Sequence, residues 1–280
     1  MKLTVWGARG SIPVSGPQYN KYGGDTTCVE LETRNGEVLI LDAGTGLRAL
    51  GNKLLAEGRK EIHFLFSHAH WDHLMGFPFF KPLYRPDVTI YCHGCTFSQQ
   101  SVQHFLSQTL RPPFFPVKLD DVAATLRFDD ECPANITVAG LCCQTIPLSH
   151  PNQGYGYRLT EGKRSVAFFP DNELSMVHFE GRAVDEYQRF LQDVDLLIHD
   201  AEYWPEEYEA FARGWGHSVF FDTVDLAVAA RAQKLVLWHL NQERSDDEVD
   251  KMGEVAQDAA NSGNTGLECL MARAQMAFEL

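Results

Sequence analysis

The 280-residue sequence lacks any long uninterrupted hydrophobic run. No stretch reaches the roughly 18 consecutive apolar residues that a membrane-spanning helix needs. The first residues, MKLTVWGARGSIP, contain no apolar run of about 7–15 residues followed by a small-residue cleavage site, as a secretory signal would. We therefore expect a cytoplasmic protein with no membrane partner.

Positive charge is also scarce. Lys and Arg total 24 against 38 Asp and Glu, which gives a formal net charge of −14 at pH 7. Such a chain repels polyanions at long range, so we do not expect long nucleic acid as a partner. A nucleic-acid substrate would have to be small, or held by a local cationic feature such as a metal ion.

A regular cysteine framework is absent as well. The seven cysteines are odd in number and irregularly spaced. This pattern favours free thiols in a reducing compartment over a disulfide scaffold. Cys92 and Cys95 form the only C-x-x-C pair, and without a second pair we interpret them as ordinary buried thiols rather than as a zinc site.

The sequence does contain a regular succession of short strands and helices. Asn35-Gly36 predicts a hairpin between strands over 27–33 and 38–42. Leucines at helical spacing predict a helix over 46–58, and an apolar strand follows over 62–66. Further strands are expected over 2–6, 141–147, 155–159, 165–169, 195–199 and 234–238. Further helices are expected over 183–193, over 222–232 and from residue 98 to a stop at Pro112-Pro113.

This order of elements predicts the fold class. Strands come first in each half, and helices then alternate with strands, which suits two sheets packed face to face with helices outside. We expect an α/β (α+β) chain that forms a four-layer αββα sandwich, as a single domain over residues 1–280.

The most unusual stretch is FLFSHAHWDHLMG, which begins at Phe64. It places His68, His70, Asp72 and His73 within six residues, directly after an apolar strand. From the chain's composition, such a match arises by chance in roughly one such sequence per thousand. Because alternate side chains of an extended segment point the same way, one short loop can aim ligands at two adjacent metal positions.

Four more polar residues end predicted strands, namely His150, Asp171, Asp200 and His239. Each of them alone is more easily explained as a structural or surface residue. Together, at the mouths of four apolar strands, they are hard to explain by core packing, because burial of an unpaired carboxylate or imidazole is costly.

The whole pattern resembles the metallo-β-lactamase superfamily, over most of the chain. H-x-H-x-D-H, the histidine of SHPNQGYGY, the aspartate of FFPDN and the histidine of LWHLNQER occur in that family's order. The resemblance implies the metallo-β-lactamase fold and two divalent ions, zinc or manganese. It assigns one ion to His68, His70 and His150, the other to Asp72, His73 and His239, and a bridging position to Asp171. A histidine at position 70, where related flavodiiron reductases usually have glutamate, favours hydrolysis over iron redox chemistry.

The C-terminal third is similar to the ribonuclease Z-like phosphodiesterase branch, through DLLIHDAEY, GWGHS and KLVLWHLNQER. By that similarity His217 would protonate the leaving group and Asp200 would orient it, although aspartate stands here where the branch has glutamate. The alternative for His217 is a loop histidine that caps the next helix together with Ser218. Asp72 could act both as a ligand and as an acceptor for the proton of a metal-bridging water.

We therefore expect a dinuclear metal-dependent phosphodiesterase. Its substrates would be small cyclic nucleotides, cyclic ribose phosphates or short single-stranded nucleic acid, attacked by a metal-bridging hydroxide. Members of the branch that process tRNA carry a protruding glycine- and proline-rich arm, and this sequence has only the short stretch 111–116. Two alternatives stay open, an acyl hydrolase (thioesterase or lactonase) of the same fold and a non-catalytic metal-binding scaffold. A homodimer is also left open.

Two further segments follow predicted strands. Asp42, in Asp42-Ala43-Gly44, is similar to a D-x-G segment in which the aspartate supports the metal loop, and a simple strand-ending turn explains it equally well. The run GARGS at 7–11 could hold a phosphate through its amides and Arg9, although a glycine-rich turn alone is a weak signal.

Overall fold

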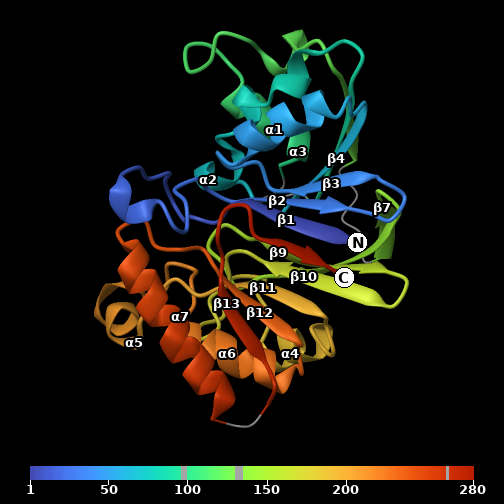
Figure 1. The fold of residues 1–280 in the computed structure, drawn as a ribbon. Helices are drawn as coiled ribbons and strands as arrows, with labels where there is room; N and C mark the ends of the chain where they lie inside the picture. The colour runs from blue at the N-terminus through green and yellow to red at the C-terminus, as the bar shows by residue number, and fades with distance from the viewer. Residues whose placement is uncertain (96–99, 130–134, 263–264) are drawn as a thin grey trace.

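The computed structural model describes residues 1–280 except 96–99, 130–134 and 263–264. The described residues form two seven-stranded sheets that pack face to face (Figure 1). In spatial order, the first sheet contains β14 (Ala277–Glu279), β1 (Lys2–Gly7), β2 (Cys28–Glu32), β3 (Val38–Leu41), β4 (Glu61–Phe66), β5 (Thr89–Gly94) and β6 (Thr125–Asp129). The second contains β13 (Glu268–Met271), β12 (Lys234–Trp238), β11 (Leu196–Asp200), β10 (Arg164–Phe169), β9 (Tyr155–Glu161), β8 (Leu141–Pro147) and β7 (Asn135–Val138).

The longer α-helices lie on the outer faces of the sheets. The α-helices are α1 (Leu47–Ala56), α2 (Trp71–Leu74), α3 (Val102–Thr109), α4 (Val184–Phe190), α5 (Pro205–Glu207), α6 (Phe220–Ala229) and α7 (Asp246–Asn261). Figure 1 shows α1 and α3 outside the first sheet and α4, α6 and α7 outside the second. The prediction of a four-layer αββα sandwich is therefore confirmed.

The central strands are apolar on both faces, which is why they sit between two layers. In β12, Leu235 and Leu237 pack toward the outer helices, whereas Val236 and Trp238 pack between the sheets. This alternation follows from the period of two along a strand. A strand buried on both sides reads as a continuous hydrophobic run, as KLVLW does.

Parallel pairing places the ends of several strands at one edge. In the second sheet β10, β11 and β12 are parallel neighbours, with Phe169 opposite His199 and Asp200 opposite Trp238. In the first sheet β3, β4 and β5 are parallel in the same way. Carboxyl ends of parallel strands meet at the same edge, so the residues that follow β10, β11 and β12 are brought together.

Most predicted elements agree with the structure to within a few residues. The Asn35-Gly36 hairpin joins β2 and β3, which pair antiparallel. The helix predicted from residue 98 begins at Val102 and ends at Thr109, before the prolines, while residues 98 and 99 lie outside the described residues. The sequence analysis did not predict β5, β6, β7, β13, β14, α2, α5 or α7.

Two further observations bear on the expectations drawn from composition. Within the described ranges, no helix combines the length and the apolar character that a bilayer span requires. Cys28, Cys142, Cys143 and Cys269 are free thiols. Cys95, in contrast, is disulfide-bonded, so the expectation of thiols alone is wrong at that position.

Candidate metal centre

The segment from the end of β4 through α2 carries four of the predicted ligands. His68 follows the strand, His70 is the residue immediately before α2, and Asp72 and His73 lie in the first turn of α2. His68, Asp72 and His73 are buried, and His70 is half-buried. The backbone that follows α2 packs closely against Gly44. A side chain at Gly76 would not fit there, since its Cβ would lie 1.9 Å from the carbonyl oxygen of Gly44.

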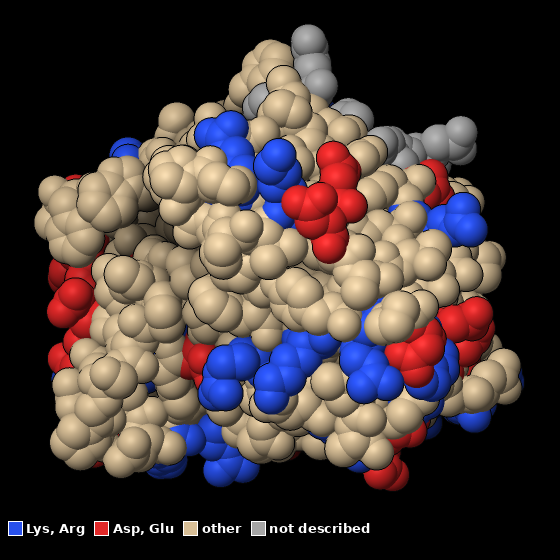
Figure 2. Space-filling view, turned by 90° about the horizontal axis from the view of Figure 1, so that it is seen from above, with Lys and Arg blue, Asp and Glu red and all other residues tan. Residues whose placement is uncertain are grey.

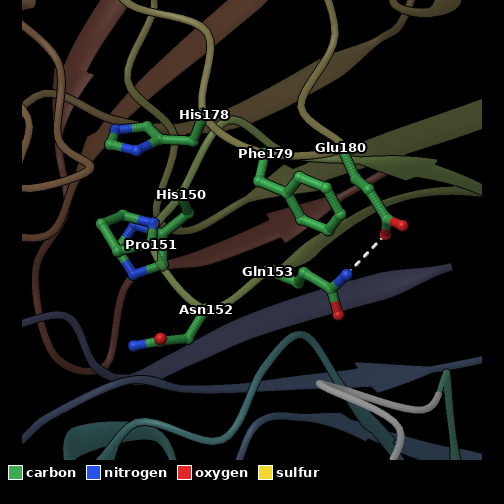
Figure 3. Close-up of a pocket in the computed structure, with 7 residues that line it drawn as sticks. All are labelled: His150, Pro151, Asn152, Gln153, His178, Phe179 and Glu180. Atoms are coloured by element: carbon green, nitrogen blue, oxygen red, sulfur yellow. Dashed lines mark hydrogen bonds between the residues drawn. The ribbon is translucent and has the colours of Figure 1, made fainter.

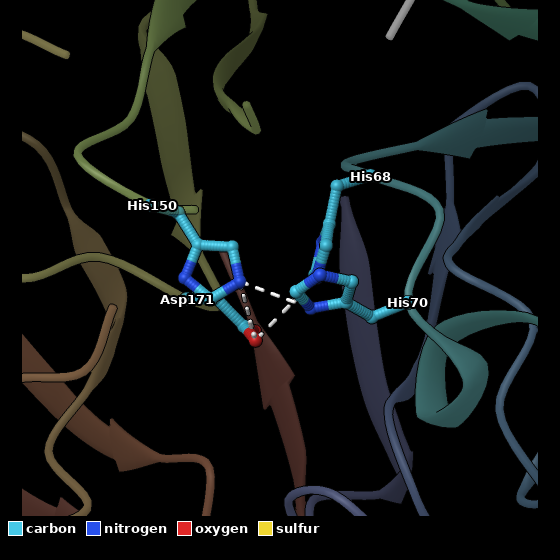
Figure 4. A group of neighbouring side chains, drawn as sticks. All are labelled: His68, His70, His150 and Asp171. Atoms are coloured by element: carbon cyan, nitrogen blue, oxygen red, sulfur yellow. Dashed lines mark hydrogen bonds and ion pairs between the residues drawn. The ribbon is translucent and has the colours of Figure 1, made fainter. Parts of the chain in front are cut away.

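The other three predicted ligands come from the second sheet. His150 follows β8, Asp171 follows β10 and His239 follows β12. His150 Nε2 lies 3.1 Å from His70 Nδ1, so these two imidazoles face each other across the two sheets (Figure 4). The structure thus brings together all seven residues that the resemblance assigned to metal binding.

Asp171 lies at the centre of this group. Its Oδ2 atom is 3.5 Å from His68 Nε2 and 3.3 Å from His239 Nε2, and its Oδ1 atom is 3.1 Å from His73 Nε2. The side chains form two clusters in which the potential ligand atoms lie within 4.8 Å of one another. One cluster is His68, His70, His150 and Asp171, and the other is Asp72, His73, Asp171 and His239. Asp171 is the member that they share.

Several of these polar atoms are buried without a hydrogen-bond partner among the described residues, namely His68 Nε2, His73 Nε2, His239 Nε2 and Asp171 Oδ1. Buried polar atoms in folded proteins are nearly always hydrogen-bonded. Four buried atoms that lack a hydrogen-bond partner and converge on one point therefore need an explanation. Imidazole nitrogens and carboxylate oxygens are the ligands that zinc and manganese accept. The buried clusters are therefore consistent with a dinuclear metal site.

The electrostatics of the two clusters also fit cations. Burial lowers the pKa values of His68, His70 and His150, which favours the neutral imidazole that can bind a metal. At His239, burial is outweighed by the carboxylates of Asp171 and Glu202, and the pKa is raised. The cluster that contains two carboxylates therefore attracts positive charge, from a proton or from a metal ion.

The opposite nitrogens of three histidines are held by hydrogen bonds from outside the clusters. His73 Nδ1 lies 2.7 Å from Asp42 Oδ2, and Asp42 also accepts hydrogen bonds from the amide and hydroxyl of Ser67. His150 Nδ1 lies 2.9 Å from the carbonyl oxygen of Gly216. Such bonds fix the tautomer so that Nε2 faces the centre. Asp42 therefore contacts the metal loop, as its supporting interpretation expected, rather than only ending a strand.

Glu202 holds the third of these histidines, and the sequence analysis missed it. Its Oε2 atom lies 2.8 Å from His239 Nδ1, and its Oε1 accepts a hydrogen bond from Asn241 Nδ2 at 2.7 Å. The signal was present in HDAEY, because Asp200 and Glu202 are two residues apart after a strand and point to the same side. Only Asp200 was assigned a role from the sequence.

We expect Glu202→Gln to weaken metal binding by about 10–100-fold, because an amide is a poorer acceptor than a carboxylate for the Nδ1 hydrogen of His239. Competition with a chromophoric chelator measures the change. Glu254→Gln, which removes the same charge from an exposed position on α7, is the matched control. Equal metal affinities in the two variants would show that Glu202 does not support the centre.

His217 lies beside the centre and is paired with Asp200. Its Nδ1 atom is 2.7 Å from Asp200 Oδ2 and 3.6 Å from Glu202 Oε2, and its ring stacks on His239 with centroids 4.3 Å apart. Burial alone would lower the pKa of His217, but the two carboxylates outweigh it and raise the pKa to about 9. With Nδ1 engaged, Nε2 is the nitrogen available for proton transfer.

The expectation that Arg9 could hold a phosphate is wrong. The side chain is fully buried, and its guanidinium donates to the backbone carbonyls of Gly23, Asn241 and Arg244 at 2.8–3.0 Å. Gly10, its neighbour, has a different importance, since a Cβ there would lie 2.1 Å from His239 Cε1. The GARGS segment therefore packs against the centre and ties distant loops together.

Comparison with known proteins places this arrangement in context. The family profile described as a β-lactamase superfamily domain matches residues 38–240. A ribonuclease Z from Sulfolobus acidocaldarius is 24% identical over 255 residues, which cover 74% of this chain and 80% of that protein. The metallo-β-lactamase fold protein YhfI from Bacillus subtilis superposes with a TM-score of 0.71 at 19% identity, over 100% of this chain and 99% of the other. A diphosphatase from the PhnP family gives a TM-score of 0.69 at 18% identity, over 100% and 97%. At these identities the structural likeness establishes the fold.

Proposed function

Since the chain belongs to the metallo-β-lactamase superfamily, we propose that it is a dinuclear metal-dependent hydrolase that cleaves small phosphodiesters. The observation that carries the proposal is the convergence of buried, unpartnered ligand atoms around Asp171. A scaffold that had lost catalysis would have little reason to keep all seven ligand positions together. We assign one ion to His68, His70 and His150, the other to Asp72, His73 and His239, and both to Asp171.

The side chains around the centre would have separate roles in hydrolysis. Two bound divalent ions would polarise the phosphoryl oxygens and lower the pKa of a water between them. Asp72 Oδ2 accepts the amide hydrogen of Ser11 at 2.9 Å and lies beside His73 and His239, where it can also receive the proton of the attacking water. His217 gives a proton to the leaving oxygen, and Asp200 holds the ring and stabilises its charge.

The pairing of His217 with Asp200 favours a phosphodiester over a thioester. An alkoxide that leaves a phosphodiester needs a proton, whereas a thiolate leaves a thioester readily without one. The curated relatives named ribonuclease Z support the same choice. The test is hydrolysis of bis(p-nitrophenyl) phosphate against that of a thioester and a lactone, with added Mn²⁺ or Zn²⁺. Faster thioester or lactone hydrolysis would replace the proposal with an acyl hydrolase.

Charge limits the size of the substrate. The net charge is −14, and on the face seen from above the basic side chains are accompanied by acidic ones within a mostly uncharged surface (Figure 2). A long polyanion would gain little from such a surface and would be repelled at long range. We therefore propose cyclic nucleotides, cyclic ribose phosphates or short single strands as the substrate classes.

We expect a full-length tRNA precursor to be cleaved more slowly than a small phosphodiester, when the two are compared by kcat/KM at physiological salt. The reason is the net charge of −14, which repels a polyanion at long range. Gel analysis of the precursor and chromatographic separation of the small ester from its phosphomonoester product provide the two values. Faster cleavage of the precursor would contradict the argument from charge.

A further inference from the structure

A cavity of about 550 Å³ opens directly beside the metal centre. Its lining residues are His150, Pro151, Asn152, Gln153, His178, Phe179 and Glu180 (Figure 3). They come from two loops, one after β8 and one after β10. His150 belongs to both the cavity and the cluster around Asp171. One small substrate could therefore place one part in the cavity and another part at the metal centre.

The chemistry of the lining disfavours a phosphate in the cavity itself. No Lys or Arg is among the lining residues, and Glu180 contributes a carboxylate that accepts a hydrogen bond from the amide of Gln153. An anion beside Glu180 would be repelled by this carboxylate, and no Lys or Arg of the lining would offset the repulsion. The neutral part of a substrate fits here, while its phosphodiester would lie at the centre.

The same lining suits a planar ring with a polar edge. Phe179 leaves 79% of its surface exposed and contributes an aromatic face at the cavity (Figure 3). The amide of Gln153 and the carboxylate of Glu180 offer hydrogen-bond donors and acceptors close to that ring, whereas the amide of Asn152 points away from it. An exposed aromatic face beside amide and carboxylate groups is the combination that stacks on a base and bonds to its edge.

The two loops are held in unusual and well-supported conformations. Asn152, Gln153 and Glu180 all have positive φ angles, of 64°, 72° and 63°, which are uncommon for residues other than glycine. Such conformations persist only where the surrounding structure enforces them, and they cluster at binding sites. The surrounding structure therefore holds these three residues in backbone conformations that are energetically unfavourable, and so fixes the positions of their side chains.

Buried Glu173 connects the cavity to the catalytic loop. Its Oε2 atom lies 2.6 Å from His178 Nε2 and accepts the amide hydrogen of Gly216 at 2.8 Å, while Oε1 accepts that of Gly214 at 2.8 Å. Gly216 in turn precedes His217, and its carbonyl holds His150. One carboxylate therefore fixes the Phe179 loop relative to the residues that would act on the phosphodiester.

We propose that this cavity binds the nucleobase of a nucleotide substrate. The assignment rests on the proposed function and narrows it, because it selects nucleotides over cyclic ribose phosphates that carry no base. Phe179 stacks on the base, and Gln153 and Glu180 contact its edge. The volume lies within the range of about 300–1,000 Å³ that is usual for small-molecule sites.

The test uses two esters with the same leaving group, p-nitrophenyl thymidine 5′-phosphate and methyl p-nitrophenyl phosphate. The wild type should favour the nucleoside ester in kcat/KM by at least about tenfold. Phe179→Ala should lower kcat/KM for the nucleoside ester by about 5–100-fold more than for the methyl ester. Phe114→Ala, which removes a ring that is 74% exposed and lies outside the cavity, should keep the wild-type ratio.

Equal kcat/KM values for the two esters in the wild type would overturn the cavity assignment and leave the phosphodiesterase proposal standing. The same holds if Phe179→Ala and Phe114→Ala change the ratio equally. If neither ester is hydrolysed, the proposed function fails, and calorimetry with thymidine 5′-monophosphate then decides on the cavity alone. Binding that is weakened at least fivefold by Phe179→Ala would support the cavity assignment, and unchanged or absent binding would overturn it.

Discussion

His217→Ala should slow hydrolysis of an unactivated phosphodiester by about 10²–10⁴-fold while both metal ions stay bound. The reason is that His217 supplies a proton to the leaving alkoxide and is not one of the seven assigned ligands. A p-nitrophenolate departs readily without a proton. The variant should therefore keep most of its activity on bis(p-nitrophenyl) phosphate, and kinetics on this ester and on a cyclic nucleotide measure the difference.

The controls for this prediction separate proton transfer from metal binding. His104→Ala removes an exposed histidine of α3 and should match the wild type on both substrates. Asp200→Asn should resemble a milder His217→Ala, since it disturbs only the orientation and charge of the imidazole. Asp200, His217 and His239 also present ligand atoms within 4.8 Å of one another, so a metal ligand is the competing role for His217. Equal losses on the two substrates, or loss of a metal ion, would contradict the proton-donor role.

Asp171→Ala should remove at least one metal ion and lower phosphodiester hydrolysis by roughly 10³-fold or more, on activated and unactivated esters alike. Asp171 faces ligand atoms of both clusters, so its loss leaves each of them incomplete. Elemental analysis of the dialysed protein and kinetics on bis(p-nitrophenyl) phosphate measure the two effects.

Two companion variants make this result interpretable. Asp185→Ala changes an exposed aspartate of α4 and should retain wild-type metal content and rate. Asp171→Asn keeps the volume of the side chain and serves if Asp171→Ala does not fold. An Asp171 variant that folds, binds two ions and retains activity would show that this carboxylate does not bridge the centre.

Local patterns explain why so much of the centre could be predicted from the sequence. The H-x-H-x-D-H motif lies within six consecutive residues, and His150, Asp171 and His239 each follow an apolar strand whose carboxyl end can be recognised from its neighbours. Parallel pairing brings the carboxyl ends of β10, β11 and β12 to one edge. β8 runs in the same direction as β10, because both are antiparallel to β9, so His150 lies at that edge too. The fold follows from the same apolar runs, because strands buried on both faces require a layer on each side.

Features that depend on long-range hydrogen bonds could not be predicted in this way. The structural role of Arg9 could not be predicted because two of its carbonyl acceptors come from Asn241 and Arg244, more than 230 residues away in the chain. The role of Glu173 likewise depends on amides about 40 residues further along, at Gly214 and Gly216. Helix α7 was missed for a different reason. Its buried face uses small residues such as Ala256, although the capping box of Ser245 and Glu248 marks its start.

The central claim is that two metal ions act together around Asp171, and a metal titration of the metal-free wild type tests it most directly. Mn²⁺ or Zn²⁺ is added in steps, and bound metal and hydrolysis of bis(p-nitrophenyl) phosphate are measured on the same samples. The two buried clusters predict that binding saturates at two ions per chain and that activity reaches its plateau only at that ratio. Saturation at one ion per chain, with full activity, would contradict the dinuclear centre.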